Sequence, residues 1–588
     1  MHYTDNATTD SNTTQIPVSQ ALTFHVGFCR NIRWQFADAR YGACHNRPDA
    51  GELYATAQLQ GGHLRSKDIL SLAKNEVQHS INRVLQGLDA ELQQASQGTL
   101  LFPVPVLLQR ISKLCKLYPS VKVFILQSRV KLVWELLAQE CERAIESQDE
   151  LSIPQLASTQ ASLGLYHDKF WSQLGSMRFC FRDSMAAVNT VHAYAALYNC
   201  NMAPHPSTEL QKVFIAGIVH HIDGVSALGL SNACWALSKL QVSGLEALWP
   251  QVQRAVARLC QSPEHMHPED VACMAYALGQ AQRPLGCACE PFVGAVQKAS
   301  SRMTGKQVAR TLRGMASMGL SAGPAHIRLM QAVEKQMCGD VIATGQMPYL
   351  VITIKALADS KLPVCSVHEA LMHTLHNSLQ SMNPAFVAAA MSACGKMYQL
   401  GSAHQQLVQP LCVPLEDAVR VSADRMDAKA VSNAVTGLVK LNGGLGTARE
   451  PLFRAVMREA ELMPPWALSA TLMAIAMIQR ELGEQCGSAM PALSAALRSC
   501  ASWDGVRSRA IGEVFWAVGM LRMDPGGRST GRLLDAAESS AEGMSVYDAE
   551  RVIVGLSWLQ SVYTGKDIKR RVGSLRVAMQ GIAESACK

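Results

Sequence analysis

The sequence predicts an all-α protein, a right-handed α-solenoid of about ten to twelve helix-turn-helix repeats of about 40 residues each. Three observations lead to this prediction. Apolar residues make up 48% of the 588 residues but aromatic residues only 6%, so the core must consist of Ala, Leu, Val and Met, which are typical of helix bundles. Charged residues make up only 17%, too few for a disordered tail. Finally, a small residue followed by a large apolar one recurs ten times at a mean spacing of about 40 residues.

This recurring pair marks one helix in each repeat. We call the large residue of the pair the anchor, and its ten copies are Tyr194, Leu237, Leu278, Met315, Leu357, Cys394, Leu438, Ile475, Val518 and Leu556. The residue before the anchor is Ala or Gly in every unit: Ala193, Ala236, Ala277, Gly314, Ala356, Ala393, Gly437, Ala474, Ala517 and Gly555. A larger side chain at that position would hold two helix backbones apart, so we expect a close helix–helix crossing there.

Other residues also recur at fixed distances from the anchor and define the rest of each repeat. Met stands twelve residues before six anchors, and apolar residues stand seven before, as at Leu230, Val271, Val308, Val431 and Ile511. The positions seven and three before the anchor, the anchor itself and the position three after it are spaced i, i+4, i+7 and i+10. This is the spacing of one helix face. A second amphipathic stretch follows each first helix, as at 247–259, 368–379 and 451–463. Such a helix pair cannot bury its own apolar face, so neighbouring units must stack.

These recurring positions divide the chain into three parts. Residues 181–588 are the predicted repeat array, and residues 67–180 an N-terminal helical region with one helix over 67–97 and two degenerate repeats over about 100–180. Residues 1–66 show no clear period and are predicted to be a polar, disordered leader. The first 20 residues hold 11 Thr, Ser, Asn or Gln and no Lys or Arg, so the basic start of a Sec signal is missing. A targeting or secretion signal of another kind is the alternative interpretation of this leader.

Neither a membrane span nor a disulfide framework is predicted. The longest apolar runs, such as residues 100–108, fall far short of the roughly 20 residues that cross a bilayer. The 18 Cys are scattered without any C-x-x-C pair, and most stand among Ala and Leu as small apolar residues. In a long chain with so apolar a core, this usage indicates free thiols in a reducing compartment.

The sequence also predicts no enzyme, no metal site and no cofactor. His368 and His373 are five residues apart rather than four, so on a helix they diverge and do not share a metal ion. Cys287 and Cys289 lack a second pair at zinc-ribbon spacing. No G-x-S-x-G motif, P-loop or kinase signature occurs.

The register of the first helices, with a period near 40, resembles the octotricopeptide repeat of green-algal organelle proteins, and the segment SNACWALSKL at 231–240 is its closest match. The resemblance covers roughly residues 180–588. It implies an α-solenoid that binds RNA through its first helices and acts in maturation, stability or translation of organellar transcripts, in a chloroplast or mitochondrion. The LSKL segment at 237–240 is also similar to the SKWP-repeat effectors of plant-pathogenic bacteria, whose secretion signals are rich in Ser, Thr and Asn. That second resemblance implies a protein-interaction scaffold secreted into a host cell.

One side of the first helix lies outside its core stripe and is a candidate binding face. It consists of the positions nine, five and two before the anchor and two after it, 40 positions in all. Three of these are acidic, namely Glu269, Asp359 and Glu513. Ten are basic, where the overall composition predicts about four: Lys239, Lys306, Arg310, Arg313, Lys355, Lys396, Lys429, Lys440, Arg509 and Arg551.

Planar and amide side chains accompany these cations at the same positions: Asn189, His192, Asn232, Trp235, Tyr276, Gln280, Asn433, Trp516 and Trp558. Phosphate-neutralising cations, amide edges and stacking aromatic rings are what single-stranded RNA readers use. The mild basic excess, a net charge of +7, permits a polyanionic partner. We therefore expect single-stranded RNA as the partner, without a cofactor, and protein–protein scaffolding as the alternative.

Overall fold

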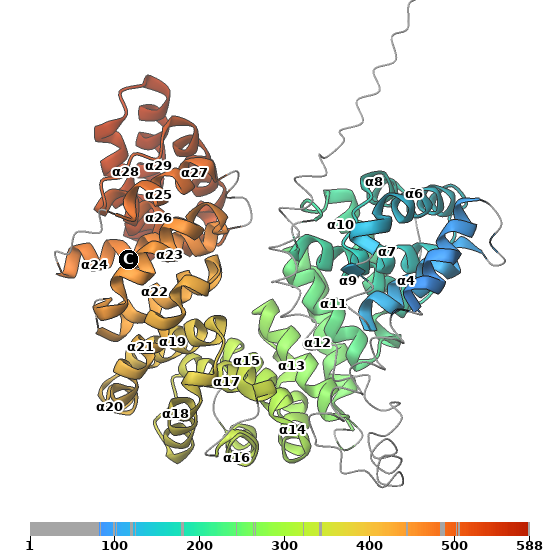
Figure 1. Cartoon of the computed structure of the whole chain (residues 1–588), viewed down its shortest axis with the longest axis horizontal. Helices are drawn as coiled ribbons and strands as arrows, with labels where there is room; N and C mark the ends of the chain where they lie inside the picture. The colour runs from blue at the N-terminus through green and yellow to red at the C-terminus, as the bar shows by residue number, and fades with distance from the viewer. Residues whose placement is uncertain are drawn as a thin grey trace, which may run out of the picture. The chain divides into compact units, whose positions relative to one another are not determined.

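Helices form the regular structure of the described chain (Figure 1). The computed structural model describes residues 82, 84–97, 100, 103–117, 122–123, 125–177, 181–200, 202–242, 244–262, 264, 266–320, 323–339, 344–442, 445–482, 488–500, 503 and 506–585. Within these residues no strand occurs, and successive helices stack as repeats. The predicted all-α solenoid is therefore confirmed, while its handedness stays a prediction. The predicted leader over 1–66 lies outside the described residues.

The described chain forms two compact units. The first comprises the residues up to Val225 together with Val242–Leu248, and the second comprises Ser226–Gln241 and Trp249–Lys588. The boundaries predicted at residues 66 and 180 stay predictions.

The first unit contains a helical segment over 84–96 and six numbered helices. These are α4 (Val104–Leu117), α6 (Val130–Glu146), α7 (Ser152–Leu163), α8 (Asp168–Ser176), α9 (Ser184–Asn199) and α10 (Thr208–His221). In one layer α4 packs on α7 and α7 on α9, and in the other α6 packs on α8 and α8 on α10. Helix pairs thus stack in the region where the sequence predicts two degenerate repeats. Leu163, at the end of α7, is fully buried.

The first helices of the second unit form one continuous layer, each packed on the next. They are α11 (Ala227–Lys239), α13 (Pro268–Ala281), α15 (Gly305–Ser317), α17 (Met347–Ser360), α19 (Pro384–Tyr398), α22 (Ala428–Asn442), α24 (Pro465–Leu482), α26 (Ser508–Met520) and α28 (Val546–Val562). Each contains one of the anchors. All ten anchors, including Tyr194 of α9 in the first unit, are at most 1% exposed, so the predicted core stripe is confirmed.

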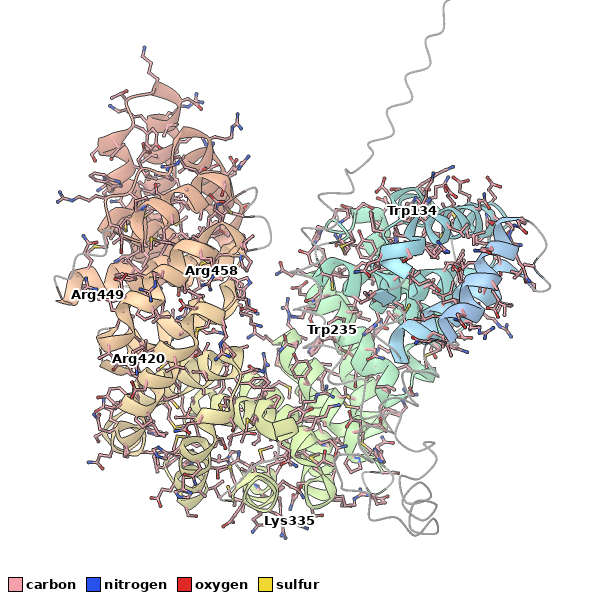
Figure 2. All side chains as sticks on the ribbon, viewed as in Figure 1. Trp134, Trp235, Lys335, Arg420, Arg449 and Arg458 are labelled. Carbon is pink, nitrogen blue, oxygen red and sulfur yellow. The ribbon has the colours of Figure 1, made fainter. Side chains whose placement is uncertain are left out.

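The second helices form the other layer (Figure 1). They are α12 (Leu245–Leu259), α14 (Cys289–Ala299), α16 (Pro324–Met337), α18 (Ser366–Ser378), the pair α20 (Ser402–Val408) and α21 (Cys412–Ser422), α23 (Arg449–Glu459), α25 (Met490–Ser499), α27 (Gly527–Ser540) and α29 (Lys566–Ser585). In Figure 2, the labelled second-helix residue Lys335 lies at the lower margin of this unit, away from Trp235 of the first helix α11. We call the side of the first helices that faces away from the second helices the inner surface of the unit.

Each first helix begins at a fixed place relative to its anchor. The N-cap residue stands eleven before the anchor, and several caps are polar: Ser226 accepts a hydrogen bond from the Gly229 backbone N–H at 3.1 Å, and Asn383 from that of Phe386 at 3.0 Å. The recurring Met, one residue earlier, precedes the helix rather than belonging to it. Met303, for example, is 2% exposed and has extended backbone. It occupies the N′ position of a hydrophobic staple, whose N4 partner is the apolar residue seven before the anchor.

The small residue before each anchor lies where two first helices cross. A Cβ atom at Gly314 would stand 2.0 Å from the Ala275 carbonyl oxygen of α13, and one at Gly555 would stand 2.3 Å from the Phe515 carbonyl oxygen of α26. These distances are far below van der Waals contact, so no larger residue fits without moving a helix. The close crossing predicted from the small residues is confirmed at these positions.

The described cysteines are free thiols, and burial raises the pKa of several of them, for example that of Cys394 to about 12. Across the described residues, no helix combines the length and the apolar character that crossing a membrane requires.

Candidate nucleic-acid interface

The predicted binding face lies on the accessible side of the first helices. Asn189 and His192 belong to α9 of the first unit, where the first is exposed and the second half-buried. All other predicted site residues belong to the second unit. Their side chains are half-buried or exposed, with the single exception of Arg551, which is 8% exposed. Trp235 of α11 illustrates this placement, since it lies away from the margin marked by Lys335 (Figure 2).

Five cations on this face form no ion pair with any described residue: Lys239, Arg313, Lys355, Lys429 and Lys440. We call them the cationic cluster. They come from four helices, α11, α15, α17 and α22, and the last of these contributes two residues. Of these side chains, Lys355 and Lys429 are exposed and the others are half-buried.

Burial and neighbouring cations both act on the pKa values of the lysines in the cationic cluster. For all four, the surrounding protein displaces water from the ammonium group and lowers its pKa below the ordinary 10.5. Neighbouring cations lower the pKa further: Arg313 acts on Lys239, Lys355 and Lys429. Even the exposed Lys355 is affected, because it is surrounded by protein on the inner surface. The repeats thus bring these cations together into a region of positive potential.

The other predicted cations are largely neutralised already. Arg310 pairs with Glu269 of the preceding repeat at 3.2 Å, and Lys396 pairs with Asp359. Arg509 and Arg551 share Glu513, at 3.0 and 3.8 Å. Each of the three acidic residues on the face is thereby paired with a predicted cation. Lys306 is half-buried on α15.

Arg551 requires a correction. The sequence assigns it to the accessible face, but its side chain is buried, its guanidinium stacks over the Tyr547 ring at 4.0 Å, and its Nη2 donates to the Tyr547 hydroxyl at 2.8 Å. Because Tyr547 and Glu513 both hold this guanidinium, it is not available to a phosphate. Its role is to join α26 and α28.

Amide and aromatic side chains surround the cationic cluster. The side-chain amides of Asn232, Asn433 and Gln280 are half-buried, and none bonds to another described residue. The Arg313 guanidinium carbon lies over the Tyr276 ring, 5.4 Å from its centroid, within cation–π distance across adjacent repeats. Trp516 is half-buried, and Trp558 donates through its Nε1 to the Met523 carbonyl at 3.0 Å.

The four recurring positions that define the predicted binding face did not include Arg507. It is exposed at the N-cap of α26, forms no ion pair with a described residue, and lowers the pKa of Lys239 electrostatically. Arg507 stands eleven residues before its anchor, outside the four positions that define the face. A face that included the cap position would have contained it.

The described residues contain no group of three or more His, Cys, Asp or Glu side chains able to hold a metal ion. His368 is buried at the start of α18, where its Nδ1 accepts a hydrogen bond from the Cys365 backbone N–H at 3.3 Å. The position of His368 is therefore explained by its part in the N-terminal cap of α18.

Comparisons with known proteins add little to this description. No protein-family model matches the chain, and no curated protein matches it. Among solved structures, the chain is similar to a chain in a homology model of the full-length AP-3 complex in an intermediate open conformation, with 11% identity over 86% of this chain and 91% of that one. The TM-score is 0.25, so this likeness carries no argument about function.

Proposed function

We propose that this protein binds single-stranded RNA along the inner surface of the first helices. The observation that carries the proposal is the cationic cluster. Five cations from four repeats have no ion-pair partner among the described residues, and the pKa values of the four lysines are lowered first by burial and then by neighbouring cations that the protein does not neutralise. A polyanion would relieve that repulsion and release its own counterions on binding.

Single-stranded RNA fits this surface better than a compact anion does. The cations are spread over several repeats, which suits a row of phosphates, and the unpartnered amides of Asn232, Asn433 and Gln280 lie among them. Amides bond to base edges, and the rings of Trp235 and Tyr276 offer faces for stacking. In the proposed complex the cations position the strand and the amides read it.

The test compares variants of the cationic cluster with a matched set. Lys239, Lys355 and Lys429 are changed together to Gln, and the control changes the ion-paired Arg310, Lys396 and Arg509 to Gln, so both variants lose three positive charges. Binding of a fluorescein-labelled random single-stranded RNA pool is measured at several salt concentrations. The cluster variant should bind more weakly, and its log–log salt slope should flatten by about 0.7 for each phosphate that is no longer neutralised.

The control set removes the same number of positive charges, but its salt slope should change much less, because cations already bound to Glu269, Asp359 and Glu513 are not the ones expected to contact phosphates. Wild-type protein that shows no salt-sensitive binding would refute the RNA proposal. Equal reductions in the two sets would also count against it, since the effect would then follow net charge rather than the cluster.

From the octotricopeptide-like repeat we further propose that the bound RNA is an organellar transcript. The proposal rests on the resemblance of SNACWALSKL at 231–240 to that repeat. Expressing residues 1–66 fused to a fluorescent protein tests it. Import into a chloroplast or mitochondrion is the expected result, and a reporter that stays outside both organelles contradicts it.

A further inference from the structure

The inner surface of the second unit changes character at α24. From α11 to α22, every first helix carries a charged or amide side chain two residues before or two after its anchor, such as Lys239, Gln280 and Lys396. From α24 to α28, all residues at these positions are apolar. We call them the apolar face: Met473 and Met477 of α24, Trp516 and Met520 of α26, and Val554 and Trp558 of α28.

The apolar face is accessible. Val554 is 39% exposed and the other five side chains are half-buried. At the start of the same helices, Trp466 is 45% exposed and Tyr547 is 61% exposed. Large exposed apolar side chains gathered on one surface indicate an interaction site more often than chance exposure does.

The backbone geometry makes this face continuous. A Cβ atom at Gly519 of α26 would stand 3.0 Å from the Val554 carbonyl oxygen of α28. The two helices therefore cross almost in backbone contact. Trp516 and Met520 therefore belong to one of two closely packed helices and Val554 and Trp558 to the other, and Trp558 Nε1 donates to the Met523 carbonyl that follows α26 at 3.0 Å.

Charge distinguishes the apolar face from the cationic cluster. The predicted cations in this region, Arg509 and Arg551, are held by Glu513, which also accepts a hydrogen bond from the Ser469 hydroxyl at 3.2 Å. Among the described residues, cations without ion pairs stand on or beside the helices of this face: Lys440 on α22, Arg480 on α24, Arg507 at the N-cap of α26 and Arg522 just after α26. The centre of this region is thus suited to an apolar ligand and its border to an acidic one.

We propose that the apolar face is a docking surface for an amphipathic α-helix of a protein partner, one with acidic side chains beside its apolar stripe. Three observations favour an amphipathic helix with acidic side chains as the ligand of this surface. Methionine side chains adapt to an incoming helix, and the two Trp rings can serve as anchors. The bordering Lys440 and Arg507 complement acidic residues. The axes of three first helices, about 8–10 Å apart, span a length that about 11–13 helical residues would cover.

This inference goes beyond the proposed function, because it assigns a different ligand to a different part of the inner surface. The experiment uses the full chain and a fluorescein-labelled peptide of about 18 residues, made of Leu and Glu with Leu at helical spacing. A peptide of the same composition in scrambled order is the ligand control. The variants are Met477→Gln and Met520→Gln, and the matched protein control is Met457→Gln, which changes an exposed Met on the second helix α23.

We expect the amphipathic peptide to bind at least tenfold more tightly than the scrambled one. Met477→Gln and Met520→Gln should each weaken its binding about fivefold or more, while Met457→Gln stays within twofold of wild type. Binding of a single-stranded oligo-U of the same length should remain within twofold in all three variants. Circular dichroism melting curves verify that each variant is folded.

Three results would overturn the inference. The first is equal affinity for the two peptides, or no binding of either. The second is an equal reduction of peptide and oligo-U binding in Met477→Gln, which would make the apolar face part of the nucleic-acid surface. The third is concentration-dependent self-association in sedimentation that Met477→Gln abolishes, which would make a second copy the occupant. Failure of the RNA proposal looks different, because oligo-U then binds to no form of the protein while the peptide still binds.

Discussion

Gly279 of α13 lies against Gly314 of α15 so closely that a Cβ atom at Gly279 would stand 2.7 Å from the Gly314 Cα. The first glycine follows its anchor and the second precedes the anchor of the next repeat. Gly395 and Gly437 repeat this arrangement, as do Gly519 and Gly555. These are the junctions between the third and fourth, sixth and seventh, and ninth and tenth anchors. These glycine-to-glycine crossings of first helices therefore recur at every third repeat.

This geometry predicts opposite effects for two Gly→Ala changes. Gly314→Ala places a methyl group 2.0 Å from the Ala275 carbonyl oxygen, so α13 and α15 must separate. We expect the free energy of unfolding to fall by about 1–3 kcal/mol. Gly294→Ala in α14 meets no atom within 4 Å, and better helix propensity should add about 0.5–1 kcal/mol. Urea unfolding followed by circular dichroism measures both, and equal effects would show that the crossing is unimportant.

The anchor column should control stability rather than ligand preference. Leu237 is 1% exposed, and Leu237→Ala should lower the free energy of unfolding by about 2–5 kcal/mol because it removes buried apolar surface and leaves a cavity. Leu228 lies on the same helix and is 47% exposed, so Leu228→Ala should change it by less than about 0.5 kcal/mol. Thermal unfolding of both variants tests the difference. A Leu237→Ala protein as stable as Leu228→Ala would contradict the assigned core.

Acid should destabilise the protein through His368. Burial, with smaller effects of His404 and His326, lowers the pKa of His368 from 6.5 to about 4. Between these values the unfolded chain takes up a proton that the folded protein does not, so stability falls as the pH drops from 6.5 toward 4. The full effect is about 3 kcal/mol. Urea unfolding at pH 7 and pH 5 should show a smaller decrease for His368→Gln than for wild type, and an unchanged decrease would refute this assignment.

RNA binding should weaken in mild alkali. The lysines of the cationic cluster have pKa values below the ordinary 10.5, so they lose their charge at a lower pH than lysines with an ordinary pKa do. Affinity for a 2′-O-methylated strand, which resists hydrolysis, should therefore begin to fall before pH 10.5 at constant ionic strength. Changing Lys239, Lys355, Lys429 and Lys440 to Arg keeps the charge and should flatten the profile. A profile that is identical in both proteins would argue against the cluster as the phosphate site.

Amide and cationic residues should affect binding differently. Asn433 has no side-chain partner among the described residues, and Asn433→Ala should change which sequences are selected from a random RNA pool, by about 1–3 kcal/mol if the amide reads one base edge. Asn232→Ala should do the same at another position in the strand. Lys440→Gln should weaken binding to all selected sequences alike. Selection profiles that are the same for all three variants would rule out base reading by these amides.

The helical architecture could be predicted from the sequence because its causes are local and repeated. Burying one helix face requires apolar residues at helical spacing, and the anchors from Tyr194 to Leu556 show that spacing directly. The small residues before them indicated the close crossings for a similar reason, since only Ala or Gly lets two backbones approach. The recurring Met was more ambiguous. Its constant distance from the anchor fits either a helical position or the N′ position, and only the cap geometry distinguishes the two.

The recurring apolar and small residues are enough to show that the chain folds as stacked helix pairs and which side of the first helices is accessible. Which cations on that side are available follows from contacts between repeats that the residue pattern does not reveal. Arg310 and Glu269 are 41 residues apart in the chain, and Arg551 meets Glu513 of the preceding repeat, so no local pattern reveals these pairs. Whether a cation is neutralised depends on how side chains of adjacent repeats reach one another. Which side chains come within contact distance depends on the spacing and rotation between neighbouring helices. The packing of the whole helix layer determines both.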